Sequence, residues 1–366
     1  MIPTVISRVS GQVRIVGAGL LGSSIGLALV AKGVDVILND ASKANLRLAI
    51  DYGAGRATQS GDEPALIIVA VPPDETAHVV ADELASWPNA LVTDVASVKA
   101  GILAELVADG ADVSRYLGSH PMAGRERGGP INARADLFLG RPWVVCAHEH
   151  SAPEQVRVIE DLALEVGAVP VAMSPEAHDE SVALVSHVPQ IVSSLLAGRL
   201  APASDEAVAL AGQGLRDTTR IAGSDPTLWV QILGANAPAV SELLKAYRAD
   251  LDTLIDALAD PAAKGARRAL AEAIAAGNDG VARIPGKHGT AKHFSTLVVM
   301  VVDKPGELAR LLTEIGELDV NMEDLRLEHS PGAQFGLAEI AVLPEKEKTL
   351  ARELEARGWK IAGETA

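Results

Sequence analysis

A glycine-rich turn near the amino terminus constrains the fold of this sequence more than any other feature. The segment "VRIVGAGLLGSSIGLAL" (13–29) holds Gly17, Gly19 and Gly22 in G-x-G-x-x-G spacing, after an apolar run and at the start of a helix-like run. In a strand–turn–helix unit the first glycine allows the tight turn and the second lets a pyrophosphate approach the backbone. The third allows the helix to pack closely on the strand. The amides of the helix N-terminus then face the anion.

An acidic residue at the right distance strengthens this interpretation. Asp40 ends the apolar run "VDVILND" and follows Gly17 by 23 residues (40 − 17), near the spacing of about 20 expected for the acid that binds a ribose hydroxyl. A glycine turn used only for packing would not explain Asp40. We therefore expect a dinucleotide site formed by these residues with Leu20, Leu21, Val71 and Pro72. A carboxylate repels a 2′-phosphate, which favours NAD over NADP, although Lys43 nearby leaves that choice open.

The first 175 residues alternate between apolar strand-like runs and runs with helical spacing. Strands separated by helices of this length predict right-handed crossovers and a mainly parallel sheet covered on both faces. Residues 1–175 are therefore expected to form an α/β Rossmann-type doubly wound domain. The predicted strands are 13–19, 34–40, 66–73, 90–97, 115–122, 141–148 and 168–175.

The remainder of the chain has a different pattern. Residues 176–284 are rich in Ala and Leu and predict an all-helical domain for substrate binding and dimerisation, with so much apolar helical surface that we expect a homodimer. Residues 285–293 predict a linker. Residues 294–366 then follow the order βαββαβ, which predicts a small ferredoxin-like domain.

Composition excludes several classes of function. Among 366 residues the net charge is −16, which argues against nucleic acid as a partner. A single cysteine, Cys146, allows neither an intrachain disulfide nor a thiolate metal cluster. The N-terminus has no signal-peptide pattern and no membrane-spanning run is evident, so we expect a cytoplasmic protein without a membrane partner.

The segment "GSHPMAG" (118–124) suggests a catalytic histidine. His120 and Ser97 each end a predicted strand, and in open α/β sheets the carboxyl ends of strands line the ligand crevice. No residue at a ligand spacing from His120 supports a metal site, and none is expected. A buried packing histidine is the plainer alternative. We favour a general base because neutral imidazole is the usual acceptor for an alcohol proton near pH 7.

The helical segment offers three more candidates. His187 lies in an otherwise apolar helix, where a structural role and a functional role are equally plausible. Arg216 and Arg220 are four residues apart, which places them on one helical face. They either form a solvated surface or bind a substrate carboxylate, since guanidinium groups bind carboxylates through two hydrogen bonds.

Five motifs together resemble the prephenate/arogenate dehydrogenases of tyrosine biosynthesis. They are "GAGLLGSSIGLAL", "DVASVKAGI", "GSHPMAGRERGG", "SHVPQ" and "GLRDTTRIAGSDPTLW", and they occur in that order over residues 12–285. The resemblance implies NAD-dependent oxidation and decarboxylation of prephenate to 4-hydroxyphenylpyruvate, or of arogenate to tyrosine.

The same resemblance implies roles for individual residues. His120 would take the proton of the substrate's ring hydroxyl, Ser97 would share that hydroxyl, and His187 would line the pocket. Arg216 would bind a substrate carboxylate, with Arg220 beside it. Many relatives have a second histidine where this chain has Gln190, which leaves the choice between a keto and an amino side chain open, with a preference for prephenate.

The tail "VVDKPGELARLLTEIGELDVNMEDLRLE" resembles an ACT domain, a small amino-acid-sensing module. By that resemblance Asp303, Gly306 and Asn321 would form an effector site, with tyrosine as the expected ligand. A tethered dimerisation unit without a ligand is the alternative.

For the whole chain, two rival functions remain. One is a β-hydroxyacid-type dehydrogenase, which would not need the histidine motif, and the other is a non-catalytic sensor of NAD and amino acids.

Overall fold

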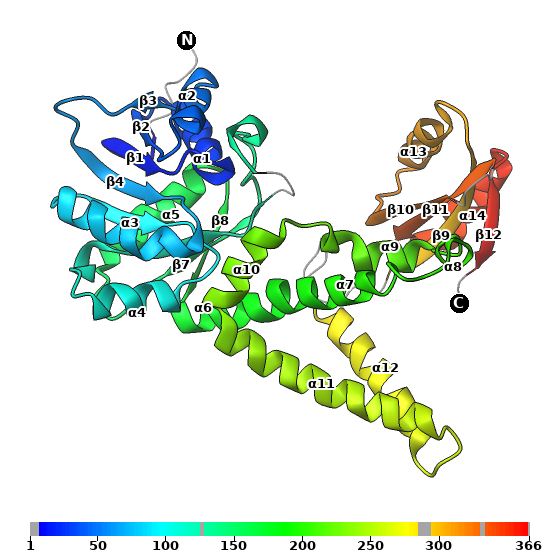
Figure 1. The fold of residues 1–366 in the computed structure, drawn as a ribbon. Helices are drawn as coiled ribbons and strands as arrows, with labels where there is room; N and C mark the ends of the chain where they lie inside the picture. The colour runs from blue at the N-terminus through cyan, green and yellow to red at the C-terminus, as the bar shows by residue number, and fades with distance from the viewer. Residues whose placement is uncertain (1–6, 125–127, 285–293, 330–333, 365–366) are drawn as a thin grey trace. The chain divides into compact units, whose positions relative to one another are not determined.

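A computed structural model describes residues 7–124, 128–284, 294–329 and 334–364 (Figure 1). The predicted linker, 285–293, lies outside these residues. Contacts divide the chain into two compact units. The first comprises Met1–Pro202 and Thr219–Tyr247, and the second comprises Ala203–Thr218 and Arg248–Ala366. The predicted helical domain is therefore shared between the units, and each unit is described by itself.

The first unit contains a five-stranded parallel sheet with the strand order β3-β2-β1-β4-β5. This order confirms the doubly wound arrangement expected for the Rossmann type. The sheet strands are β1 (Gln12–Val16), β2 (Val36–Asn39), β3 (Arg56–Ala57), β4 (Pro64–Val69) and β5 (Leu91–Asp94).

The remaining strands of this unit form a second, three-stranded sheet. They are β6 (Gly118–Pro121), β7 (Pro142–Cys146) and β8 (Val169–Met173). β7 pairs parallel with β8 but antiparallel with β6, so the expectation of parallel pairing fails at this one position. A parallel bridge between Val92 and Tyr116 links β5 to the start of β6, and the carboxyl ends of these two strands therefore lie side by side.

Helices cover both faces of the parallel sheet, which explains why its strands are mostly apolar. Ile68 packs into one buried cluster and its neighbour Ile67 into the other, as the alternation of side chains along a strand requires. Figure 1 shows these helices around the sheet. The helices are α1 (Leu20–Val30), α2 (Lys43–Asp51), α3 (Pro73–Ser86), α4 (Ala100–Ala108) and α5 (Pro153–Glu165), with 3-10 turns η1 (Val113–Arg115) and η2 (Pro130–Asn132).

Residues 175–282 contain only helices, as predicted. The segment Pro175–Gly198 is one continuous helical run, long and apolar enough to span a membrane by length and composition alone. It also carries buried polar side chains, which belong to the site described below. The elements are α6 (Pro175–Val182), the π-turn η3 (Ala183–His187), α7 (Val188–Gly198), α8 (Asp205–Val208), α9 (Gln213–Thr219), η4 (Arg220–Ala222), α10 (Pro226–Ala235), α11 (Ala237–Ala259) and α12 (Ala266–Ala282).

The C-terminal segment forms an antiparallel sheet of order β10-β11-β9-β12 with two helices, which confirms the βαββαβ layout. Leu311 and Leu350, one from each helix, are buried with the central strands in a separate core. The elements are β9 (Ser295–Val302), α13 (Glu307–Glu317), β10 (Asp324–His329), β11 (Phe335–Val342), α14 (Pro344–Ala356) and β12 (Lys360–Glu364).

Candidate active site

The glycine turn between β1 and α1 has the geometry that a dinucleotide requires. Gly17 has a φ of +104°, and a Cβ added there would collide with the carbonyl of Ala70. A Cβ on Gly22 would collide with the carbonyl of Gly17, which is the close helix–strand approach that the spacing predicts. A Cβ on Gly19, by contrast, would meet no atom of the described residues within 4 Å. The space above Gly19 therefore lets another group approach the backbone.

Asp40 lies beside this turn. Its Oδ2 accepts a hydrogen bond from the amide of Ala18 at 2.6 Å, and its Oδ1 accepts one from Ser42 at 2.7 Å. Among the residues that the structure describes, no side chain caps the N-terminus of α1, so the first amides of the helix remain available to an anion. The turn, the free helix end and the acid together fit a dinucleotide.

The other predicted cofactor residues surround the same strand ends. Leu20 and Leu21 begin α1 and are half-buried. Val71 and Pro72 connect β4 to α3, with Val71 half-buried and Pro72 exposed. Because the carboxyl ends of β1 and β4 adjoin, all four lie at the edge of the sheet where nucleotides bind in this fold.

His120 lies on β6 and is half-buried. Its Nδ1 is 2.9 Å from Nε2 of His178 on α6. Burial lowers the pKa of His120 well below its usual range, and the nearby His178 and the positive charge of Lys99 act in the same direction. The imidazole is therefore neutral at pH 7, which is the state that a general base requires.

His178 is itself held by a carboxylate. It is fully buried, and its Nδ1 lies 2.7 Å from Oδ1 of Asp179. The same carboxylate accepts the backbone amides of Lys99 at 2.8 Å and Ala100 at 2.9 Å, at the N-terminus of α4. Asp179 thus ties α6 to the loop that leaves β5.

A second buried carboxylate shapes the loop that carries Ser97. Asp94, at the end of β5, pairs with Nζ of Lys99 and accepts the hydroxyl of Tyr116 at 2.6 Å. Burial and this carboxylate raise the pKa of Tyr116 well above its usual range. Ser97 lies on the loop between β5 and α4 and is half-buried. Within the described part of the chain its hydroxyl has no hydrogen-bond partner.

His187 ends the π-turn between α6 and α7 and is buried. Turns of this kind are rare and are frequent at functional sites. Its Nδ1 lies 3.1 Å from Nδ2 of Asn236, and its ring meets Trp229 edge-on at 6.1 Å between centroids. Burial lowers the pKa of His187 to about 4, so this imidazole is also neutral at pH 7.

Gln190 follows on α7 and is buried. Its amide contacts Ser194 at 3.2 Å and Ser224 at 3.4 Å. This second contact joins α7 to the segment that begins with η4, whose first residue is Arg220. Arg220 is exposed, and it makes no side-chain hydrogen bond or ion pair to any residue that the structure describes.

A change of helix type separates the two arginines. The helix α9 ends at Thr219, and a 3-10 turn begins at Arg220. Arg216 is exposed on α9 and belongs to the second compact unit, whereas Arg220 belongs to the same unit as His120. The structure therefore associates Arg220, and not Arg216, with the unit that holds the histidines.

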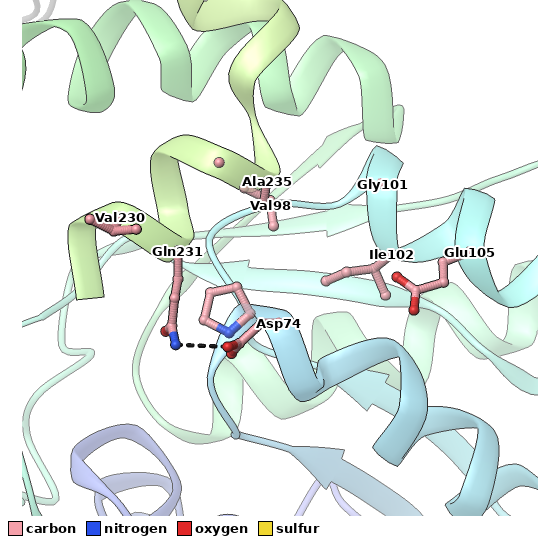
Figure 2. Close-up of a pocket in the computed structure, with 10 residues that line it drawn as sticks. Asp74, Val98, Gly101, Ile102, Glu105, Val230, Gln231 and Ala235 are labelled. Carbon is pink, nitrogen blue, oxygen red and sulfur yellow. Dashed lines mark hydrogen bonds between the residues drawn. The ribbon is translucent and has the colours of Figure 1, made fainter. Parts of the chain in front are cut away.

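A cavity of about 380 Å³ is found elsewhere in the first unit (Figure 2). It is formed where α3, α4 and α10 meet, and Gln231 donates a hydrogen bond to Asp74 across it at 2.8 Å. Val98 borders it, but neither His120 nor His187 lines it. This cavity is therefore separate from the candidate catalytic groups.

The hydrogen bonds that reach His120 and His187 come from three residues that were not predicted from sequence: His178, Asp179 and Asn236. The adjacent pair His178–Asp179 near a helix start was the only available signal, and such pairs are common on solvated helix faces. Asn236 carries no recognisable pattern. It is placed by the break between α10 and α11, where its side chain donates to the carbonyl of Asp179 at 2.8 Å.

Comparison with known proteins identifies the family. Residues 25–172 match the sequence profile described as prephenate dehydrogenase, nucleotide-binding domain, and residues 174–273 match that described as prephenate dehydrogenase, dimerization domain. A probable prephenate dehydrogenase of Streptomyces niveus is 38% identical over 354 residues, which cover 94% of this chain and 98% of the relative.

Solved structures agree with this result. An arogenate dehydrogenase of Synechocystis is 28% identical with a TM-score of 0.62, and the match covers 73% of this chain and 99% of the other. A prephenate dehydrogenase of Aquifex aeolicus, in complex with hydroxyphenyl propionate and NAD+, is 25% identical with a TM-score of 0.66. That match covers 75% of this chain and all of the other.

Proposed function

The chain belongs to the prephenate dehydrogenase family, and we infer from this membership and from the site that it catalyses the NAD-dependent oxidative decarboxylation of prephenate to 4-hydroxyphenylpyruvate, a step of tyrosine biosynthesis. One observation carries the proposal. A neutral imidazole, His120, lies at the end of β6 in the unit whose β1–α1 turn fits a dinucleotide.

The reaction needs one acceptor for a proton. When bound, NAD accepts a hydride from the ring carbon that bears the hydroxyl group. His120 takes the hydroxyl proton as the C–O bond becomes a carbonyl. Loss of the ring carboxylate as CO2 then leaves a phenolate, and the proton returns from His120 to the phenolate oxygen. The overall reaction releases no net proton, and aromatisation makes it favourable.

A His120→Asn variant tests this role. We expect its kcat to fall by roughly 10²–10⁴-fold, the usual contribution of a general base. NAD affinity, measured by fluorescence titration, should change little because residue 120 is not part of the glycine turn. Turnover at the wild-type rate would show that His120 is not the base.

Arg220 is the better candidate for binding a substrate carboxylate. It shares a unit with His120, and its guanidinium is free of partners among the described residues. Gln190 and Ser224 bring its segment against α7, which begins directly after His187. A guanidinium in this place can bind a carboxylate through two hydrogen bonds.

The two arginines provide a matched pair of variants. Arg220→Gln should raise the KM for prephenate by about 10–100-fold, the equivalent of one lost charge-assisted pair. Arg216→Gln removes the same charge four residues away and should leave KM within about threefold. If Arg216→Gln gave the larger effect, the original assignment from the resemblance would be correct and this one wrong.

Prephenate is the proposed substrate, with arogenate as the alternative. Gln190 supports this choice because its amide already contacts two serines, and it has no negative charge to pair with the ammonium group of arogenate. NADH absorbance with each substrate, and with NAD and NADP in turn, tests both preferences. A higher kcat/KM for arogenate would reverse the assignment.

We further propose that a second copy of the chain covers the apolar side of the α6–α7 run. Leu184, Val185 and Leu195 are each at least 60% exposed there. The match of residues 174–273 to a dimerization domain supports this partner. Leu184→Glu combined with Leu195→Glu should shift the sedimentation coefficient to that of a monomer, whereas an unchanged coefficient would remove this surface from the interface.

The ferredoxin-like domain is proposed to act as an ACT domain that binds tyrosine. Gly306 caps α13 with a φ of +92°, and Asp303 lines a cavity of about 200 Å³ beside it. Asn321 is exposed and contacts Glu323. Asp303→Ala in the full chain should abolish inhibition by tyrosine without changing basal turnover. Unchanged inhibition would place the effector elsewhere.

A further inference from the structure

We propose that Asp179 fixes the proton positions on both imidazoles of the active site, so that Nε2 of His120 is an acceptor and Nε2 of His187 is a donor. The proposal rests on the proposed function only in taking His120 as the base. His178, Asp179 and Asn236 are positioning residues in it, since they act through the two histidines.

The first chain of hydrogen bonds runs from Asp179 through His178 to His120. The carboxylate of Asp179 accepts backbone N–H groups at both oxygens, and we take its contact with Nδ1 of His178 as a third hydrogen bond that it accepts. The proposal places a single proton on His178, on the Nδ1 that lies 2.7 Å from Oδ1 of Asp179. Its Nε2 then carries a lone pair.

This lone pair determines the tautomer of His120. Nε2 of His178 lies 2.9 Å from Nδ1 of His120, and a hydrogen bond between them requires a proton on one of the two atoms. Since Nε2 of His178 has none, Nδ1 of His120 must be the donor. The proton of His120 is thereby held on the side away from the substrate, and its Nε2 is free to accept the hydroxyl proton.

The second chain of hydrogen bonds runs from the backbone of Asp179 through Asn236 to His187. The carbonyl of Asp179 can only accept, so the atom of Asn236 that lies 2.8 Å away is its nitrogen. The other proton of that nitrogen points to Nδ1 of His187 at 3.1 Å. Nδ1 of His187 is therefore an acceptor, and its proton lies on Nε2.

The consequence is a division of roles between two histidines that are chemically alike. His120 can only accept at Nε2, as the base must, whereas His187 can only donate there, as a group that binds a keto or carboxylate oxygen must. When His120 takes the substrate proton, the new imidazolium donates to His178, and the charge of Asp179 at the end of the chain stabilises it. The carboxylate of Asp179 thus sets the tautomer of His120 before proton transfer and stabilises its charged form afterwards.

A pair of substitutions at His178 separates this role from a packing role. The amide oxygen of His178→Gln can take the place of Nε2 and accept from His120. The amide of His178→Asn is shorter: it can replace Nδ1 toward Asp179 but cannot reach His120. A role in packing or in pairing the buried carboxylate favours the Asn variant, whereas the proposal favours the Gln variant.

We expect His178→Asn to lower kcat for prephenate by about 10²-fold or more, within the range of a lost general base, with KM within about threefold of wild type. His178→Gln should stay within about tenfold of the wild-type kcat. Circular dichroism and NAD titration identify any variant that fails to fold. Equal losses in two folded variants, or a more active Asn variant, would overturn the proposal.

Neutron diffraction from crystals of the full chain with NAD provides a readout that does not depend on turnover. The expected map has protons on Nδ1 of His120, Nδ1 of His178 and Nε2 of His187. A proton on Nε2 of His120, or a doubly protonated His178, would overturn the proposal. A wild-type enzyme inactive on prephenate and arogenate but with the expected protons would refute the proposed function alone.

Discussion

Mild acid should destabilise the folded chain through His187. This side chain is only 1% exposed, and burial lowers its pKa from 6.5 to about 4. In the unfolded chain the imidazole regains a pKa near 6.5. Because the folded pKa is the lower one, the unfolded chain binds the extra proton first as the pH falls. The stabilisation is complete above the unfolded pKa and is lost through the interval between the two values.

The size of the loss follows from the two pKa values. For a folded pKa of about 4, the linkage relation gives about 2 kcal/mol less stability at pH 5 than at pH 7, approaching about 3 kcal/mol near pH 4. The physical cause is the cost of placing a charge where the ring is enclosed by Trp229 and where Nδ1 faces an amide donor, Asn236. A protonated Nδ1 would lose that hydrogen bond.

Urea unfolding of the wild type and of His187→Asn, at one protein concentration and at pH 7 and pH 5, measures this effect. The Asn oxygen can still accept from Asn236 but does not titrate. The variant should be less stable at both pH values because it leaves a cavity, yet its stability should fall by about 2 kcal/mol less between them. Parallel pH dependence in the two proteins would refute the reasoning.

Three further outcomes are expected. Since the pKa of His120 lies well below its usual range, kcat/KM for prephenate should stay level as the pH falls from 8 to 6, and a fall centred near pH 6.5 would contradict this. Asp40→Asn should lower the preference for NAD over NADP by about tenfold or more, because it removes the charge that repels a 2′-phosphate; steady-state kinetics with both cofactors measure the ratio. Burial raises the pKa of the Cys146 thiol to about 12, so iodoacetamide should label it only after unfolding, as mass spectrometry of native and urea-treated protein would show.

The features that could be predicted from sequence are local in the chain. The glycine turn combines tight spacing with a backbone conformation that only glycine adopts easily, and the structure places Gly17 in that conformation. The strands of the parallel sheet are mostly apolar because helices bury both faces. The apolar run 115–122 likewise predicted a strand with His120 near its end, and β6 confirms this position.

The features that could not be predicted depend on distant segments. β6 and β7 pair antiparallel, and the apolar pattern of a strand does not record the direction of its neighbour. The spacing of Arg216 and Arg220 predicts one helical face, but it does not reveal that the α-helix changes to a 3-10 turn at Arg220. A four-residue spacing predicts neighbours only where the helix is continuous.

Asp179 shows why the site and the fold cannot be separated in this chain. Its side chain holds the amides of Lys99 and Ala100, which anchor α4 directly after the loop of Ser97, and its carbonyl holds Asn236 between α10 and α11. Two segments, each more than fifty residues away from Asp179 in the sequence, thus converge on this one residue of α6. Until they do, neither His120 nor His187 has a partner that selects its tautomer. The proton positions that the chemistry requires are therefore a product of tertiary packing, which explains why the histidines could be identified from their motifs while the residue that controls them could not.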